Sequence, residues 1–167
     1  MTAQQREEFG KYFAARAIAF CSLFYLYIWL WVDPLLLYHV QEPPFFFGWI
    51  FFADLAAYPG GLSEYLSSFL SQFYFYPWFG ALCITAIVGL ICLCTRTYIT
   101  ALGGARFTNL PFVPAIFLVA LHNRYLYELS ADLGLLFVLA GLAVYACMPL
   151  CRASLRALVF VGLSLPL

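Results

Sequence analysis

Charge is what this sequence has least of. Only 10% of its 167 residues are Asp, Glu, Lys or Arg, whereas hydrophobic residues make up 65% and the mean hydropathy is +0.92. Soluble domains carry about 25% charged residues, so this composition excludes an ordinary soluble domain and indicates an integral membrane protein. The formal net charge is zero, which gives no reason to expect nucleic acid as a partner. We therefore expect an all-α, polytopic fold surrounded by a lipid bilayer.

The sequence also lacks the marks of a disulfide framework, a metal site and the common catalytic motifs. Its six cysteines lie mostly in apolar runs: Cys21, Cys83, Cys92, Cys94, Cys147 and Cys151. Cys92 and Cys94 form a C-x-C pair with no His or second pair nearby, so we expect no metal and interpret the cysteines as packing groups. No P-loop, HExxH, G-x-S-x-G or dinucleotide fingerprint occurs. The cofactor, if one exists, is therefore unknown.

Long apolar runs, in contrast, are abundant. Crossing a bilayer takes about 20 residues of helix. The sequence predicts transmembrane helices at residues 17–32, 78–94, 110–122 and 133–150. The third is short and contains Pro111 and Pro114. A last apolar run at 157–167 is too short to cross, and we interpret it as an incomplete fifth span, with the chain as the N-terminal part of a longer protein. The expected count is four to five spans.

The placement of charge predicts the orientation. Seven of the eight basic residues fall before the first span, between the second and third, or after the fourth: Arg6, Lys11, Arg16, Arg96, Arg106, Arg152 and Arg156. Only Arg124 falls on the other side, where most of the acidic residues also lie. By the positive-inside rule, the amino terminus is expected in the cytoplasm.

The outer loop, residues 33–77, contains no Lys or Arg. After Pro59-Gly60-Gly61, apolar residues repeat at helical spacing over 62–75. The opposite arc, which we expect to face water, is polar: Ser63, Glu64, Ser67, Ser68, Ser71 and Gln72. Upstream, a helix over 44–58 would be about 22 Å long, less than the roughly 30 Å hydrocarbon core. The sequence therefore predicts two helices lying parallel to the membrane, joined by the YPGG turn.

Three residues of this loop are candidate catalytic groups. Asp33 ends the first span, His39 follows it closely, and Asp54 interrupts an apolar helix. Each has a structural alternative: Asp33 as a helix cap, His39 as a hydrogen-bonded interfacial residue, and Asp54 as a side chain directed to water.

A second outer cluster lies between the third and fourth spans. His122 and Arg124, accompanied by Asn123, Glu128 and Asp132, are candidate substrate-binding residues. Their alternative is a structural one, in which they anchor the ends of the two spans.

Two resemblances bear on function. Residues 38–82 resemble the N-terminal signature of a family of large, uncharacterised bacterial inner-membrane proteins. The matching elements are Gln41, Tyr58-Pro59-Gly60-Gly61, Tyr65-Leu66, Phe69-Leu70 and Gln72-Phe73-Tyr74. This resemblance implies a multi-pass protein of the bacterial inner membrane, a longer chain and no assigned activity.

The layout of one span followed by two membrane-parallel helices is similar to the start of C-type integral-membrane glycosyltransferases. Those enzymes use lipid-linked sugar donors and place an acidic catalytic residue just after the first span, a position that Asp33 would match. The sequence departs from that pattern because Asp33 is followed by Pro34 and has no second acidic neighbour.

Three hypotheses about function follow. The first is an enzyme similar to these glycosyltransferases, acting on a lipid-linked substrate with Asp33 as an acid/base group or as a metal-associated carboxylate. The second is a non-enzymatic scaffold or accessory subunit that packs against other membrane subunits through its aromatic outer loop. The third is a transporter fragment in which the proline-interrupted third span lines a path. The third is the least favoured by the sequence, because no ionisable residue falls in the middle of a predicted span.

Overall fold

The computed structural model describes residues 3–35, 45–104, 107–124 and 127–148, and these residues contain helices and no strand. The helices are α1 (Ala3–Tyr27), its π-helical continuation η1 (Ile28–Val32), α3 (Trp49–Ala56), α4 (Gly61–Ser71), the 3-10 turn η2 (Gln72–Phe75), α5 (Pro77–Ala101), the 3-10 turn η3 (Leu110–Phe112), α6 (Val113–Leu121) and α7 (Leu129–Cys147). The predicted all-α fold is confirmed for these residues.

Three segments are long and apolar enough to cross a membrane: Gly10–Val32, Pro77–Ala101 and Leu129–Cys147. They overlap the first, second and fourth predicted spans. The predicted third span is a shorter apolar helix, Leu110–Leu121, so the expected count of four to five spans is not confirmed. The predicted incomplete span at 157–167 lies outside the described residues.

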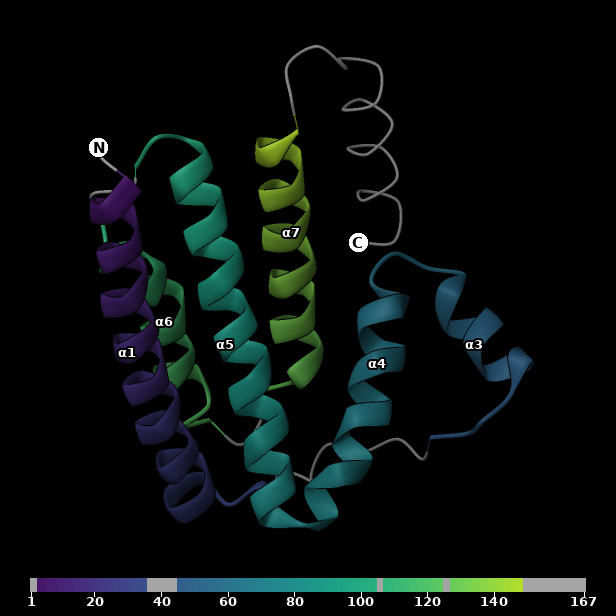
Figure 1. Cartoon of the computed structure of the whole chain (residues 1–167). Coiled ribbons are helices and arrows are strands. Elements are labelled where there is room, and N and C mark those ends of the chain that lie inside the picture. Colours follow the sequence, from purple (N-terminus) through teal and green to yellow (C-terminus); the bar gives the residue numbers. More distant parts are fainter. Residues whose placement is uncertain (1–2, 36–44, 105–106, 125–126, 149–167) are drawn as a thin grey trace.

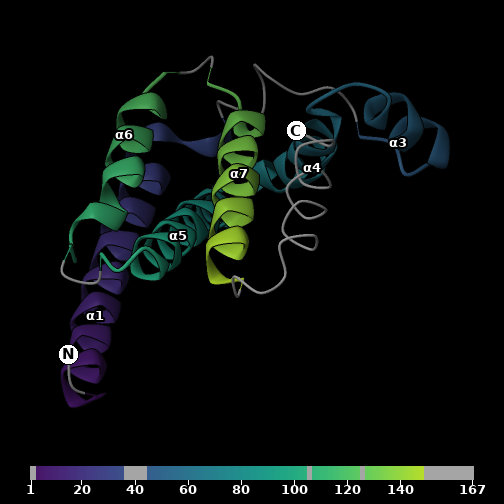
Figure 2. The ribbon, with the colours of Figure 1, turned by 90° about the horizontal axis from the view of Figure 1, so that it is seen from above.

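Helix α5 is the centre of the bundle. Helices α1 and α6 lie together on one side of it and α7 on the other (Figures 1 and 2). Ala81, Ile84, Val88 and Ile91 recur at helical spacing along α5 and are completely buried. Because lipid tails are as apolar as these side chains, close van der Waals packing rather than escape from water holds such helices together.

Helix α6 runs beside α1 but ends well before it. The ring of Phe112 lies 5.3 Å from that of Phe13 and 5.6 Å from that of Phe20, and the His122 ring lies 6.1 Å from that of Phe24, measured between ring centroids. From Phe24 to Val32 the chain continues for eight more helical residues, about 12 Å at 1.5 Å per residue. The end of α6 at His122 is therefore recessed from the end of the first span.

The two helices of the outer loop differ from the prediction in length and layout. Helix α3 begins only at Trp49, because the preceding Gly48 is extended (φ −170°, ψ 146°). Helix α4 packs against α5 and α7 and runs along the bundle, with α3 outside it (Figure 1). The predicted arrangement of two membrane-parallel helices is thus not confirmed.

The polar arc of α4 also differs from expectation. The exposed fractions of Ser63, Ser68 and Ser71 are 8%, 8% and 2%, whereas the sequence predicts that these serines face water. Their hydroxyls need no water, because Ser63 donates to the carbonyl of Gly60 (2.6 Å) and Ser71 to that of Ser68 (3.0 Å). Small residues allow helices to approach closely in a membrane, which explains why α4 buries its serines where it packs in the bundle.

The turn between α3 and α4 depends on two glycines. Gly60 has a φ of 86°, in the left-handed region that favours glycine. A Cβ atom on Gly61 would lie 1.6 Å from the carbonyl oxygen of Leu55, so only glycine fits there. Aromatic rings then join the two helices, as where the rings of Phe52 and Tyr65 meet edge to face at 5.1 Å.

Candidate functional site

Asp33 occupies a turn at the end of the first span. It has a φ of 49°, the only positive φ of a non-glycine residue in the described part of the chain. Its N–H donates to the carbonyl of Ile28 (3.1 Å), and its Oδ1 accepts the N–H of Leu35 (3.2 Å). Such an Asx-type turn is a structural use of an aspartate. Pro34, which follows, is buried near Gly80 of α5.

The other candidate catalytic residues do not join Asp33. Asp54 is exposed on α3, and α3 lies on the far side of the molecule from α1 in both views (Figures 1 and 2). His39 lies outside the described residues. The structure therefore does not bring Asp33 and Asp54 together.

Of the candidate substrate-binding residues, His122 is buried and Arg124 is exposed. The Arg124 backbone shapes the turn after α6: its N–H donates to Leu121 (3.0 Å) and its carbonyl accepts from Tyr127 (3.0 Å). The guanidinium is thus placed on the surface, while the imidazole turns into the bundle.

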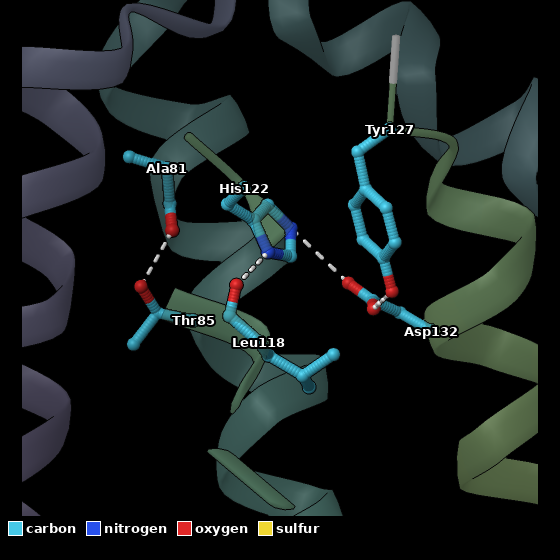
Figure 3. Close-up of polar contacts among 6 residues, drawn as sticks. All are labelled: Ala81, Thr85, Leu118, His122, Tyr127 and Asp132. Carbon is cyan, nitrogen blue, oxygen red and sulfur yellow. Dashed lines mark hydrogen bonds and ion pairs between the residues drawn. The ribbon is translucent and has the colours of Figure 1, made fainter. Parts of the chain in front are cut away.

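His122 meets a buried carboxylate there, in the arrangement that Figure 3 shows. The Nε2 atom of His122 lies 3.1 Å from Oδ2 of Asp132. Asp132 lies in the first turn of α7, and its exposed fraction is 0%. The hydroxyl of Tyr127 donates to the other carboxylate oxygen, Oδ1, at 2.6 Å. On the far side of the imidazole, Nδ1 lies 2.9 Å from the carbonyl oxygen of Leu118. We call His122, Tyr127 and Asp132 the buried triad.

These contacts fix the number of protons in the buried triad. A carbonyl oxygen only accepts hydrogen bonds, so Nδ1 of His122 must carry a hydrogen. Nε2 then faces Oδ2, which is buried and receives no well-aligned hydrogen bond within the described residues. Without a proton between them, two lone pairs would oppose each other. One proton, on either Nε2 or Oδ2, turns this repulsion into attraction.

That single proton also makes the pair electrically neutral. With it, the pair is either imidazolium with carboxylate or imidazole with carboxylic acid; without it, a buried negative charge remains, which is costly in an apolar interior. Burial, and then the hydrogen bond to Asp132, raise the pKa of the Tyr127 phenol above its ordinary range. Tyr127 therefore remains a hydrogen-bond donor over the whole physiological pH range.

The surroundings of the triad are apolar or already bonded. The Phe24 ring meets that of His122 edge-on, and Thr85 of α5 donates to the carbonyl of Ala81 at 2.7 Å (Figure 3). No group of three His, Cys, Asp or Glu side chains among the described residues could hold a metal ion. The arrangement holds one proton between an imidazole and a carboxyl group.

The sequence places His122 and Asp132 in the same outer cluster, but it does not indicate that they are buried or that Tyr127 bonds to Asp132. Tyr127 carries no signal of its own in a sequence with twelve tyrosines. The one usable signal is the short stretch between His122 and Asp132, which places the end of one helix near the start of the next.

A chain whose described residues form helices and no strand, with three candidate spans and a buried His–Asp pair, has the features of a membrane protein. The chain belongs to a family of unknown function (DUF6057), whose family model matches residues 11–167. This membership agrees with the predicted likeness to an uncharacterised family. Comparison with curated proteins gives no match, and neither does comparison with solved structures.

Proposed function

We propose that this chain is a multi-pass membrane protein that binds a proton between His122 and Asp132 and carries it across the membrane. The observation that carries the proposal is the 3.1 Å approach of Nε2 to a fully buried Oδ2, while Nδ1 is committed to a carbonyl. Ionisable residues inside membrane segments characteristically serve proton relays and transport paths. Asp132 belongs to the candidate span Leu129–Cys147 and lies in its first turn.

The proton would control how α6 packs against α7. With the proton bound, the neutral pair joins the two helices; on its release, a buried charge and opposed lone pairs favour their separation or the entry of water. Helix α6 is short and ends about 12 Å from the end of the first span, so its end can move without carrying a full-length span with it. Protonation of the His122–Asp132 pair is therefore coupled to the packing of α6 against α7.

The proposed orientation has the amino terminus in the cytoplasm and the buried triad nearer the outer surface of the inner membrane. Its support is that Arg16 and Arg96 lie toward one end of the bundle, and Glu128 with Asp132 toward the other. A proton would then reach Asp132 from the outer side, past the turn that contains Arg124 and Tyr127.

Proton flux into vesicles tests this function. The protein is reconstituted with a pH-sensitive dye inside the vesicles, and a potassium diffusion potential, negative inside, is imposed. We expect internal acidification with the wild type and none with Asp132→Asn, whose amide can accept from Tyr127 and donate to Nε2 but cannot carry the proton. Glu64→Gln, an exposed carboxylate on α4, is the matched control and should leave the flux unchanged. Equal flux with Asp132→Asn, or no flux with the wild type, would refute the proposal.

The other two hypotheses have less support. A sugar-transferase centre at Asp33 needs a carboxylate directed into a polar cavity, whereas Oδ1 of Asp33 is used to close a turn. A scaffold is suggested by exposed apolar side chains such as Trp49 (79% exposed) and Ile50 (77%), but lipid would cover such side chains equally well.

A further inference from the structure

We infer that the end of the bundle remote from the buried triad binds the phosphate of an anionic phospholipid, between α1, α5 and the start of η3. Two arginines stand at this end of the bundle, and the printed partners of each are neutral. The Cζ atom of Arg96 lies 4.0 Å from the centre of the Phe13 ring. Arg16 donates through Nη1 to Oδ1 of Asn109 (2.9 Å) and, at 3.4 Å, to Oγ1 of Thr108. Among the side chains that the structure describes, no carboxylate pairs with either arginine.

The two arginines flank one aromatic contact. Phe13, under Arg96, packs on Phe112 with ring centroids 5.3 Å apart, and Phe112 follows Asn109, the partner of Arg16, by three residues. A Cβ atom added at Gly10 would lie 3.9 Å from Nη2 of Arg96. The Arg96 side chain thus reaches from the Phe13 level toward Gly10, one turn nearer the end of the candidate span.

Both arginines are attached inside the candidate spans. Arg96 stands five residues before the end of α5 at Ala101, and Arg16 six residues after the start of the first span at Gly10. At 1.5 Å per residue these depths are about 8 and 9 Å. Long arginine side chains can reach the headgroup level from there, but a charge at this depth is costly unless it is paired.

A phospholipid phosphate would supply a negative charge at that level. Guanidinium groups bind phosphate through paired, charge-assisted hydrogen bonds, and basic pockets between transmembrane helices on the cytoplasmic side bind anionic headgroups. The amide of Asn109 and the hydroxyl of Thr108 add neutral hydrogen-bonding groups beside Arg16. The phosphate of phosphatidylglycerol meets both requirements, because it carries the charge and its acyl chains keep it at this depth.

Native mass spectrometry of the purified protein in neutral detergent tests the inference. Phosphatidylglycerol and phosphatidylcholine are added at equal concentration, and the bound lipid is counted. We expect the wild type to retain phosphatidylglycerol preferentially and Arg16→Gln/Arg96→Gln to lose that preference. Each guanidinium removed should weaken binding about tenfold, the effect of losing one charge-assisted hydrogen bond. Arg96→Lys, which keeps the charge, should retain part of the preference.

Arg124→Gln is the matched control, because it removes an exposed guanidinium at the other end of α6. It should leave lipid retention unchanged and so separates a site from general attraction to positive charge. Equal retention of the two lipids by the wild type, unchanged retention by the double variant, or displacement of the lipid by millimolar inorganic phosphate would overturn the inference. Because this site is distant from the buried triad, none of these outcomes affects the proposed proton binding.

Discussion

Tyr127→Phe isolates one hydrogen bond of the buried triad. The substitution removes the hydroxyl that donates to Oδ1 of Asp132 at 2.6 Å and keeps the ring that packs on His122, with centroids 5.0 Å apart. Because the acceptor is a completely buried carboxylate, no solvent can replace the lost donor. A hydrogen bond to a charged group contributes about 1.5–3 kcal/mol, so we expect a loss of that size.

Thermal unfolding in detergent micelles can measure this loss. For a chain of this length, each kcal/mol shifts the midpoint by about 2–4 °C, so Tyr127→Phe should lower Tm by about 3–12 °C. Tyr58→Phe is the matched control, since Tyr58 makes the same phenol-to-carboxylate bond with Glu64 in an exposed position. Water can replace that bond, and little change is expected. The same small effect from both substitutions would show that water reaches the carboxylate of Asp132, and it would refute the predicted loss of stability.

The pH dependence gives the same prediction a second readout. The pKa of Tyr127 is raised in the folded protein, first by burial and then by the hydrogen bond to Asp132, so the folded state holds this proton more tightly than the unfolded state. The stabilisation is therefore complete below the ordinary tyrosine pKa of about 10 and declines as pH rises above it, by up to about 1.4 kcal/mol per pH unit. The difference in Tm between the wild type and Tyr127→Phe should shrink above about pH 10; a constant difference would contradict this account.

Two further predictions concern the fold and its orientation. Gly61→Ala places a Cβ atom 1.6 Å from the carbonyl oxygen of Leu55, so it should separate α3 from α4 and lower Tm by several degrees. Gly134→Ala, which has open space around the added Cβ atom, should leave Tm unchanged. Equal effects of the two substitutions would show that the turn at Gly61 is not tight. Asn123→Cys should react with a membrane-impermeant thiol reagent from outside intact cells and Leu102→Cys only after lysis. Both residues are exposed, and Asn123 follows the end of α6 whereas Leu102 follows the end of α5, toward the opposite end of the bundle. The reverse pattern would invert the proposed topology.

The sequence predicted the long helices well, because length and apolar composition largely determine a membrane span. The three segments that qualify by length each exceed 18 residues, and they stand where the apolar runs indicated. The layout of α4 could not be predicted in the same way. Its serine-rich arc has the periodicity of a water-facing surface, but small hydroxyl residues that bond to their own helix serve equally well for close packing. Only the neighbouring helices decide between the two.

Two residues of the candidate site, His122 and Asp132, could be predicted from the sequence, but their contacts could not. His122 was a candidate from its position at a span end, but its partner was not determined by sequence spacing alone. Arg124 is nearer to His122 along the chain than Asp132 is. The partner of the imidazole is nevertheless Asp132 of α7, which follows the turn that the Arg124 backbone forms. Asp33 had the position of a catalytic acid, and its local backbone instead uses the carboxylate to close a turn. Both outcomes depend on backbone geometry that periodicity does not encode.

Nitrogen NMR of His122 in lipid bilayers tests the central claim most directly. The chain has two histidines, so His39→Gln in protein labelled with ¹⁵N-histidine leaves His122 as the only signal. The account predicts that Nδ1 carries a hydrogen and that one proton is held between Nε2 and Asp132. In Asp132→Asn the amide donates to Nε2 in place of that proton, so Nε2 should carry no hydrogen. A neutral ring with a bare Nδ1 and its hydrogen on Nε2 would contradict the account, because the carboxylate would then be satisfied without a shared proton.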